Sequence, residues 1–152
     1  MVDTSHIGYR HPPHTVDVEA GKLRSFAKAI GETRSEYLDE AAARAAGYRA
    51  LPAPPTYMFS LELDHPDPFA LVRVLKIKLH HVLHGTQRFI YHRPVCAGDR
   101  ITLQQTVEEV FEKNDGALGF VVVRTTATNQ LGELAGEAVK TIVVRQKKAK
   151  AS

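Results

Sequence analysis

The sequence predicts an α+β fold in which helices come first and a sheet of consecutive antiparallel strands follows. Two helical patterns with one apolar face occupy the first third of the 152-residue chain. From residue 86 onward, β-branched and aromatic runs alternate with short turns, as in an antiparallel meander. We expect a long apolar helix to lie on a curved sheet, which would bury both Phe26 and the valine run at 121–123.

Composition and charge limit what the chain can be. It is 43% hydrophobic and 24% charged, so residues 1–146 are expected to form a single domain and 147–152 a basic flexible tail. Its net charge of +3 comes without a basic stripe interleaved with aromatic residues, so no nucleic-acid partner is expected. Cys96 is the only cysteine, and neither a secretory signal nor a membrane span is evident, which favours a cytoplasmic protein.

The first helical region contains a break. Residues 22–30 predict a helix, because their apolar side chains recur at three- and four-residue spacing. Gly31 is expected to end it, since glycine adopts the left-handed conformation without steric cost. Thr33 and Glu36 then fit a capping box that starts a second, alanine-rich helix, although Ser35 is a rival N-cap.

The middle of the chain is less regular. A short strand is expected at residues 14–18, before the first helix. Residues 51–56 contain three prolines and can be neither helix nor central strand. Residues 57–63 predict a short helical turn. The following stretch is ambiguous, since it fits either a short helix at 69–75 or a strand at 72–79.

The second half predicts the sheet. The apolar alternation slips near 107–110, which indicates a bulge or a strong bend. The sequence Asn-Asp-Gly at 114–116 fits a hairpin turn. The apolar run 120–123 is expected of a strand that is covered on both faces. The expected long strands cover residues 86–92, 101–111, 118–128 and 134–145.

One pair of side chains could carry chemistry. Glu32 and Tyr37 lie five residues apart across the break between the first two helices. A carboxylate beyond a helix C-terminus feels the negative end of the helix dipole, so we expect a raised pKa. If Glu32 is also buried, it can serve as a general acid or base. The alternative is a solvated Glu32 and a Tyr37 ring that packs on the first helix. His81 and His84 are three apart in a weakly helical stretch, so we expect no metal and no cofactor.

Two longer segments, residues 26–56 and 83–103, resemble the N-terminal-type domain of MaoC-like dehydratases, the (R)-specific enoyl thioester hydratase group. The second segment is the more specific, through His84-Gly85, Gln87, the run Tyr-His-Arg-Pro at 91–94 and Gly98-Asp99. The resemblance implies a hot-dog fold, a long helix wrapped by an antiparallel sheet that pairs with a second hot-dog. It also implies reversible addition of water to the 2,3 double bond of an acyl-CoA or acyl-carrier-protein thioester.

The resemblance fails at the reacting groups. Active members use an Asp and a His in the segment G-D-x-N-P-x-H. Here Glu32 and Tyr37 occupy those two positions, and Arg34 replaces the Asn. Tyrosine, with an ordinary pKa of about 10, is a poor substitute for an imidazole near 6.5. The resemblance therefore implies no assured catalytic residue, with His84 as a further candidate, and substrate-binding roles for Pro55, Thr56, His84 and Gly85.

Three functions remain open from the sequence. The chain is expected to be a subunit of a heteromeric (R)-hydratase or dehydratase that shapes the acyl site for a catalytic hot-dog partner. Alternatively, a homodimer is itself a hydratase that uses Glu32 with Tyr37 or His84. A third possibility is an acyl-thioester-binding or thioesterase-like hot-dog. In each case the expected ligand is an acyl-CoA or acyl-carrier-protein thioester, and whether the chain is itself an enzyme is left open.

Overall fold

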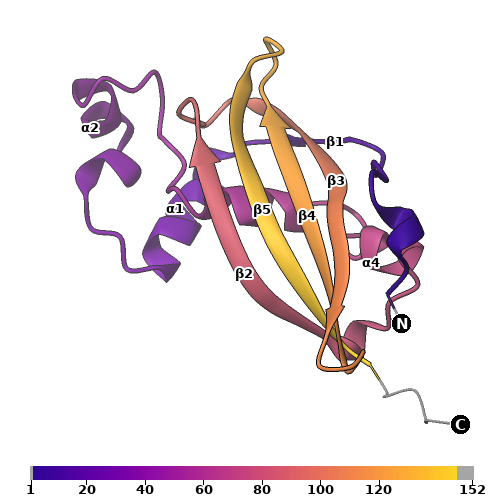
Figure 1. Cartoon of the computed structure of the whole chain (residues 1–152). Coiled ribbons are helices and arrows are strands. Elements are labelled where there is room, and N and C mark those ends of the chain that lie inside the picture. Colours follow the sequence, from indigo (N-terminus) through magenta and orange to yellow (C-terminus); the bar gives the residue numbers. More distant parts are fainter. Residues whose placement is uncertain (1, 147–152) are drawn as a thin grey trace, which may run out of the picture.

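The computed structural model describes residues 2–146, so the expected tail at 147–152 lies outside the described residues. Five antiparallel strands form one curved sheet in the order β1-β3-β4-β5-β2 (Figure 1). The strands are β1 (His14–Asp17), β2 (Val82–Tyr91), β3 (Arg100–Lys113), β4 (Leu118–Thr128) and β5 (Leu134–Arg145). The expected α+β class is confirmed, and the meander β3-β4-β5 has the short turns that the sequence predicts.

The helices are short and precede the meander. They are α1 (Ala20–Ala29), α2 (Glu40–Ala45), α3 (Tyr57–Leu63) and α4 (Ala70–Val74), with 3-10 turns at Thr4–His6, Ser35–Tyr37 and Leu79–His81. The helical interpretation of the ambiguous stretch is therefore correct, and a strand at 72–79 is wrong. In the described part of the chain, no helix is long and apolar enough to cross a membrane.

The expected capping box is wrong. Asp39 is the N-cap of α2, and its side chain accepts a hydrogen bond from the backbone N–H of Ala42 at 2.8 Å. The backbone N–H of Thr33 donates to the side chain of Glu32 instead, which directs this part of the chain away from a helical start. A single 3-10 turn, Ser35–Tyr37, fills the gap before α2.

The strands confirm one detail of the sequence pattern and correct another. The β3-β4 register shifts between Val107 and Glu109, which is the bulge expected near 107–110. In β4, however, buried and half-buried residues alternate along the whole strand. Val121 and Val123 face the core, whereas Val122 lies on the opposite face and is half-buried. The helices cover only one face of the sheet, so the run is not covered on both faces within this chain.

Two apolar clusters fill the space between the helices and the sheet. The first contains Leu23 from α1, and Phe26 packs against it with its ring edge-on to Tyr57 at 5.2 Å. The second lies under α4 and contains Val121 and Val123. Phe26 and the valine run thus belong to separate clusters under different helices. The remaining cluster residues are Val16, Val18, Leu51, Met58, Leu61, Ile101, Leu103, Ala127 and Ala138 in the first, and Leu71, Leu75, Val107, Val110, Ile142 and Val144 in the second.

Candidate functional site

The break after α1 positions the candidate catalytic pair. Gly31 has a φ of 73°, a conformation that favours glycine, and the backbone N–H of Glu32 returns to the carbonyl of Ala27 at 2.9 Å. The chain then leaves the helix axis and runs into the 3-10 turn that contains Tyr37. The segment between α1 and α3 projects beyond the end of β2 (Figure 1). Glu32 and Tyr37 are therefore placed on an irregular, outlying part of the fold.

The carboxylate of Glu32 is fully occupied by the residues that follow it. Its Oε1 accepts from the backbone N–H groups of Thr33 and Arg34 and from Arg34 Nε, each at 3.0 Å. Its Oε2 accepts from Arg34 Nη2 at 2.7 Å, and the Glu32 side chain is only 13% exposed. This bidentate contact with the guanidinium stabilises the charged form of the carboxylate.

Glu32 therefore has the opposite electrostatic character from the one expected. The hydrogen bonds from the Arg34 side chain, and then from its backbone N–H, lower the pKa of Glu32 to about 2. The predicted upward shift is wrong, because two direct bonds from a guanidinium outweigh the weak field at the end of α1. At neutral pH this carboxylate holds no proton to give and is a weak base.

Tyr37 is also poorly suited to proton transfer. Its side chain is buried, and burial raises its pKa above the ordinary value for a phenol. The guanidinium of Arg34 lies 4.7 Å from the centre of the Tyr37 ring, so one cation contacts both members of the pair. At physiological pH the phenol is neutral and can donate a hydrogen bond, but it cannot exchange protons as an imidazole does.

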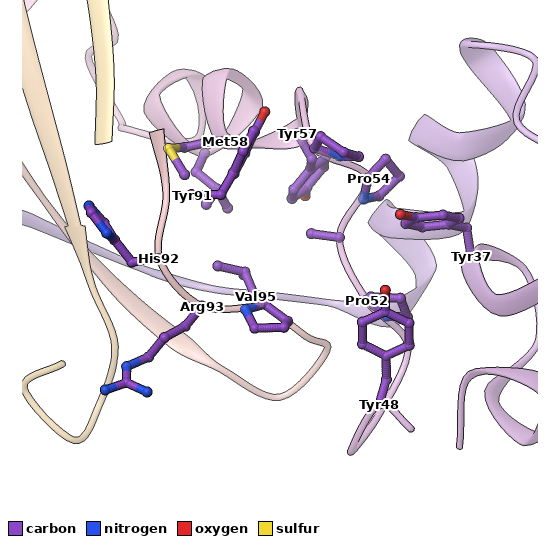
Figure 2. Close-up of a pocket in the computed structure, with 14 residues that line it drawn as sticks. Tyr37, Tyr48, Pro52, Pro54, Tyr57, Met58, Tyr91, His92, Arg93 and Val95 are labelled. Carbon is purple, nitrogen blue, oxygen red and sulfur yellow. The ribbon is translucent and has the colours of Figure 1, made fainter. Parts of the chain in front are cut away.

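Next to Tyr37 is a cavity of about 270 Å³. The proline-rich segment before α3, the helix itself and the chain around Tyr91 form its walls (Figure 2). In Figure 2 the Tyr37 hydroxyl points toward Pro54, on the side of the cavity opposite Tyr91 and His92. The lining is mainly apolar, with four tyrosines and few charges, a composition suited to a small organic ligand with an apolar part.

Only one of the four expected substrate-binding residues lines this cavity. Pro55 lines the cavity. Thr56 immediately follows it as the N-cap residue of α3, but makes no side-chain cap hydrogen bond and is not among the lining residues. His84 and Gly85 lie at a register shift in β2, near the end of the strand opposite to Tyr91, so they do not reach this cavity.

Structural constraints act on His84 and Gly85. The ring of His84 packs against Phe59 of α3, with the two ring centres 5.3 Å apart. A Cβ atom on Gly85 would lie 2.8 Å from Cγ2 of Val143 and 3.1 Å from the Thr141 carbonyl oxygen, so only glycine fits without a shift. The close approach of β5 to the bulge accounts for this glycine without a substrate.

Several residues of the site escape analysis of the sequence. Arg34 is visible there only as a replacement for asparagine, although an opposite charge two residues from Glu32 is a signal of pairing. Tyr48 gives no local signal, because only the tertiary fold brings it to the cavity. Among residues 2–146, no group of three or more His, Cys, Asp or Glu side chains could hold a metal ion.

Comparison with known proteins places this geometry in a family. A family model described as "FAS1-like, dehydratase domain region" matches residues 5–138. The chain belongs to this FAS1-like dehydratase family. It is also 38% identical over 146 residues to a UPF0336 protein of Streptomyces griseus, covering 95% of each chain.

Solved structures agree with the family. A chain of the HadBC (3R-hydroxyacyl-ACP dehydratase) complex from Mycobacterium tuberculosis has a TM-score of 0.75 and 30% identity, covering 91% of this chain and 96% of that one. A MaoC-like dehydratase has a TM-score of 0.81 at 23% identity, over 93% of this chain and 43% of that one. The ChsH1–ChsH2 complex from M. tuberculosis gives 0.72 at 20% identity, over 94% and 92%. The FAS1-like chain thus has the MaoC-like hot-dog fold.

Proposed function

We propose that the chain is a subunit of an (R)-specific 3-hydroxyacyl-thioester dehydratase or enoyl-CoA hydratase. In this proposal it shapes the acyl-binding site, while a hot-dog partner supplies the catalytic carboxylate and imidazole. The observation that carries the proposal is the contact of Arg34 with Glu32. A carboxylate with a pKa of about 2, beside a buried neutral phenol, lacks the acid and base that hydration requires.

An exposed edge of the sheet favours a hot-dog partner. On the outer side of β2, no strand of residues 2–146 pairs with it. Exposed apolar side chains occur at and before the start of this edge strand, namely Leu79 and Leu83. Two others are Leu63, the last residue of α3, and Phe69, just before α4. An unpaired strand edge with apolar neighbours is suited to antiparallel strand addition. The HadBC and ChsH1–ChsH2 structures are complexes of this kind of chain, which supports a heteromer.

The cavity beside Tyr37 is the proposed acyl site. Its apolar lining would cover a hydrocarbon chain, and Pro55 lies in its wall. The thioester is either an acyl-CoA or an acyl-carrier-protein conjugate. The lone cysteine agrees with a cytoplasmic location, which is part of the proposal. We assign neither a catalytic nor a substrate-binding role to His84, and no substrate-binding role to Thr56 or Gly85, because none of them lines this cavity.

The hydration of crotonyl-CoA tests the proposal. With the purified chain alone, the absorbance of the enoyl thioester should fall no faster than in the uncatalysed reaction. Addition of a hot-dog subunit with an intact Asp-His segment should produce turnover. Robust hydration by the chain alone, lost in Glu32→Gln, would show a self-sufficient homodimer. Release of free thiol from saturated acyl-CoA would instead show a thioesterase-like enzyme.

A further inference from the structure

A buried polar group interrupts the apolar interior between the two clusters. Lys140 of β5 forms an ion pair with Glu62 of α3, and their side chains are only 14% and 5% exposed. Gln105 of β3 donates from Nε2 to Glu62 Oε2 at 3.1 Å. Gln87 pairs with Lys140 across the β2-β5 ladder. We call these four residues, Glu62, Gln87, Gln105 and Lys140, the polar barrier.

The barrier lies in line with the cavity. Three alternate pairs of the β2-β5 ladder are Tyr91 with Gly136, Phe89 with Ala138, and Gln87 with Lys140. Alternate residues of a strand share one face, so these three pairs form parallel rows on the same side of the sheet. The first row borders the cavity through Tyr91. The second row is apolar at Phe89 and Ala138 but continues to Thr125 of β4 and to the barrier residue Gln105 of β3, and the third row contains Gln87 and Lys140.

Helix α3 runs over the same rows. Its buried residues are Tyr57, Met58, Leu61 and Glu62, and the first three line the cavity. Met58 lies directly over the first row, because a Cβ on Gly136 would be 2.3 Å from Met58 Cε. Glu62 lies one helical turn farther on and contacts the third row through Lys140. An acyl chain that extends from the cavity along α3 therefore reaches the polar barrier after Met58 and Leu61.

The barrier is suited to stopping a hydrocarbon. Glu62 Oε1 and both polar atoms of the Gln87 amide are buried and have no hydrogen-bond partner among the described residues. A methylene chain cannot satisfy these atoms, and it would have to separate an ion pair away from water. The residues beyond the barrier along β5, Ile142 and Val144, are apolar again and belong to the second cluster.

We propose that the Glu62–Lys140 ion pair, with Gln87 and Gln105, sets the maximum length of the acyl chain that this subunit accepts. This inference rests on the proposed function, since it assumes that the cavity holds an acyl thioester. Gln87 is four residues from Tyr91 along β2, so the Gln87–Lys140 pair lies roughly 13 Å along the strand from the row that borders the cavity, at about 3.3 Å per residue. Longer chains gain no further burial in the native protein.

Calorimetric titration with butyryl-, octanoyl- and dodecanoyl-CoA tests the inference on the full chain. Native protein should bind octanoyl-CoA more tightly than butyryl-CoA, with no further gain for dodecanoyl-CoA. E62M/K140M keeps the side-chain volume but removes both charges, an exchange that buried ion pairs often tolerate. It should bind dodecanoyl-CoA at least about tenfold more tightly than native protein, because two newly buried methylenes account for about that factor.

A second variant and a control complete the test. Q87L removes the unpartnered amide without breaking the ion pair, and should shift the preference in the same direction. K22A/D64A removes an exposed ion pair at the end of α3, 3.1 Å long, and should leave the preference unchanged. A native preference that keeps rising to dodecanoyl-CoA, or folded variants with the native preference, would overturn the inference alone. Absence of binding at every length, in native protein and variants alike, would remove the proposed acyl site and this inference with it.

Discussion

Arg34 donates three hydrogen bonds to the Glu32 carboxylate, two from its guanidinium and one from its backbone N–H, and the backbone N–H of Thr33 donates a fourth. The pair spans two residues of sequence, so the contact forms within the turn and needs no other element of the fold. The resemblance to MaoC-like dehydratases implies a carboxylate at the position of Glu32, and Arg34 forms an ion pair with the carboxylate that is present. The pKa of Glu32 thus depends on a neighbouring residue that is neither Glu32 nor Tyr37.

Removal of Arg34 should reduce the change in the free energy of unfolding between neutral and acidic pH. A carboxyl group with a lowered folded-state pKa adds stability that is complete above its unfolded pKa, near 4.5, and disappears as the pH falls toward about 2. R34A should therefore be less stable than native protein at pH 7, and the two should converge between pH 4.5 and 2. Urea unfolding at several pH values measures this difference. R44A, which breaks the exposed Arg44–Glu40 pair, is the control and should show a much smaller pH dependence.

The sequence predicts the secondary structure well but not the state of the site. The helix at 22–30, the hairpin turns and the bulge near Val107 follow from local spacing and turn residues, which depend on near neighbours. The pKa of Glu32 does not, because it depends on which way the Arg34 side chain folds back. Tyr48 and Tyr91 are 43 positions apart in the sequence and meet at the cavity only through tertiary packing.

Gly85→Ala should reduce stability rather than ligand binding. The added Cβ would meet Val143 Cγ2 at 2.8 Å and a backbone carbonyl of β5 at 3.1 Å, so the bulge would have to move, at a cost of about 1–3 kcal/mol. Urea unfolding reports the loss, and G85A/V143A should recover part of it. A variant of native stability with weakened acyl-CoA binding would instead restore Gly85 as a substrate-binding residue.

Replacing only one partner of the buried ion pair should strongly destabilise the protein. Lys140→Met leaves the Glu62 carboxylate buried without its cation, which costs about 3–5 kcal/mol in comparable buried pairs. The double variant E62M/K140M should recover most of this loss, because neither charge then remains in the interior. Chemical denaturation of the two variants and the native chain measures the difference. Equal stability of the single and double variants would show that the pair is not buried in solution.

Leu23→Ala tests the packing of α1 on the first cluster. Leu23 is fully buried, so truncation should cost about 2–5 kcal/mol through lost burial and a residual cavity. Leu131→Ala, in the turn between β4 and β5, removes a side chain that is 75% exposed and should change stability by less than about 0.5 kcal/mol. Similar losses in both variants would contradict the assigned core.

The pKa of Glu32 itself tests the central claim most directly. Carbon-13 NMR titration of the side-chain carboxyl, assigned by comparison with Glu32→Gln, should give a pKa of about 2 in the native chain and a clearly higher value in R34A. Such a result would establish that Arg34 holds the carboxylate ionised and unfit for proton transfer. A native pKa above the ordinary value of about 4.5, unaffected by the loss of Arg34, would contradict the account and return Glu32 to the list of catalytic candidates.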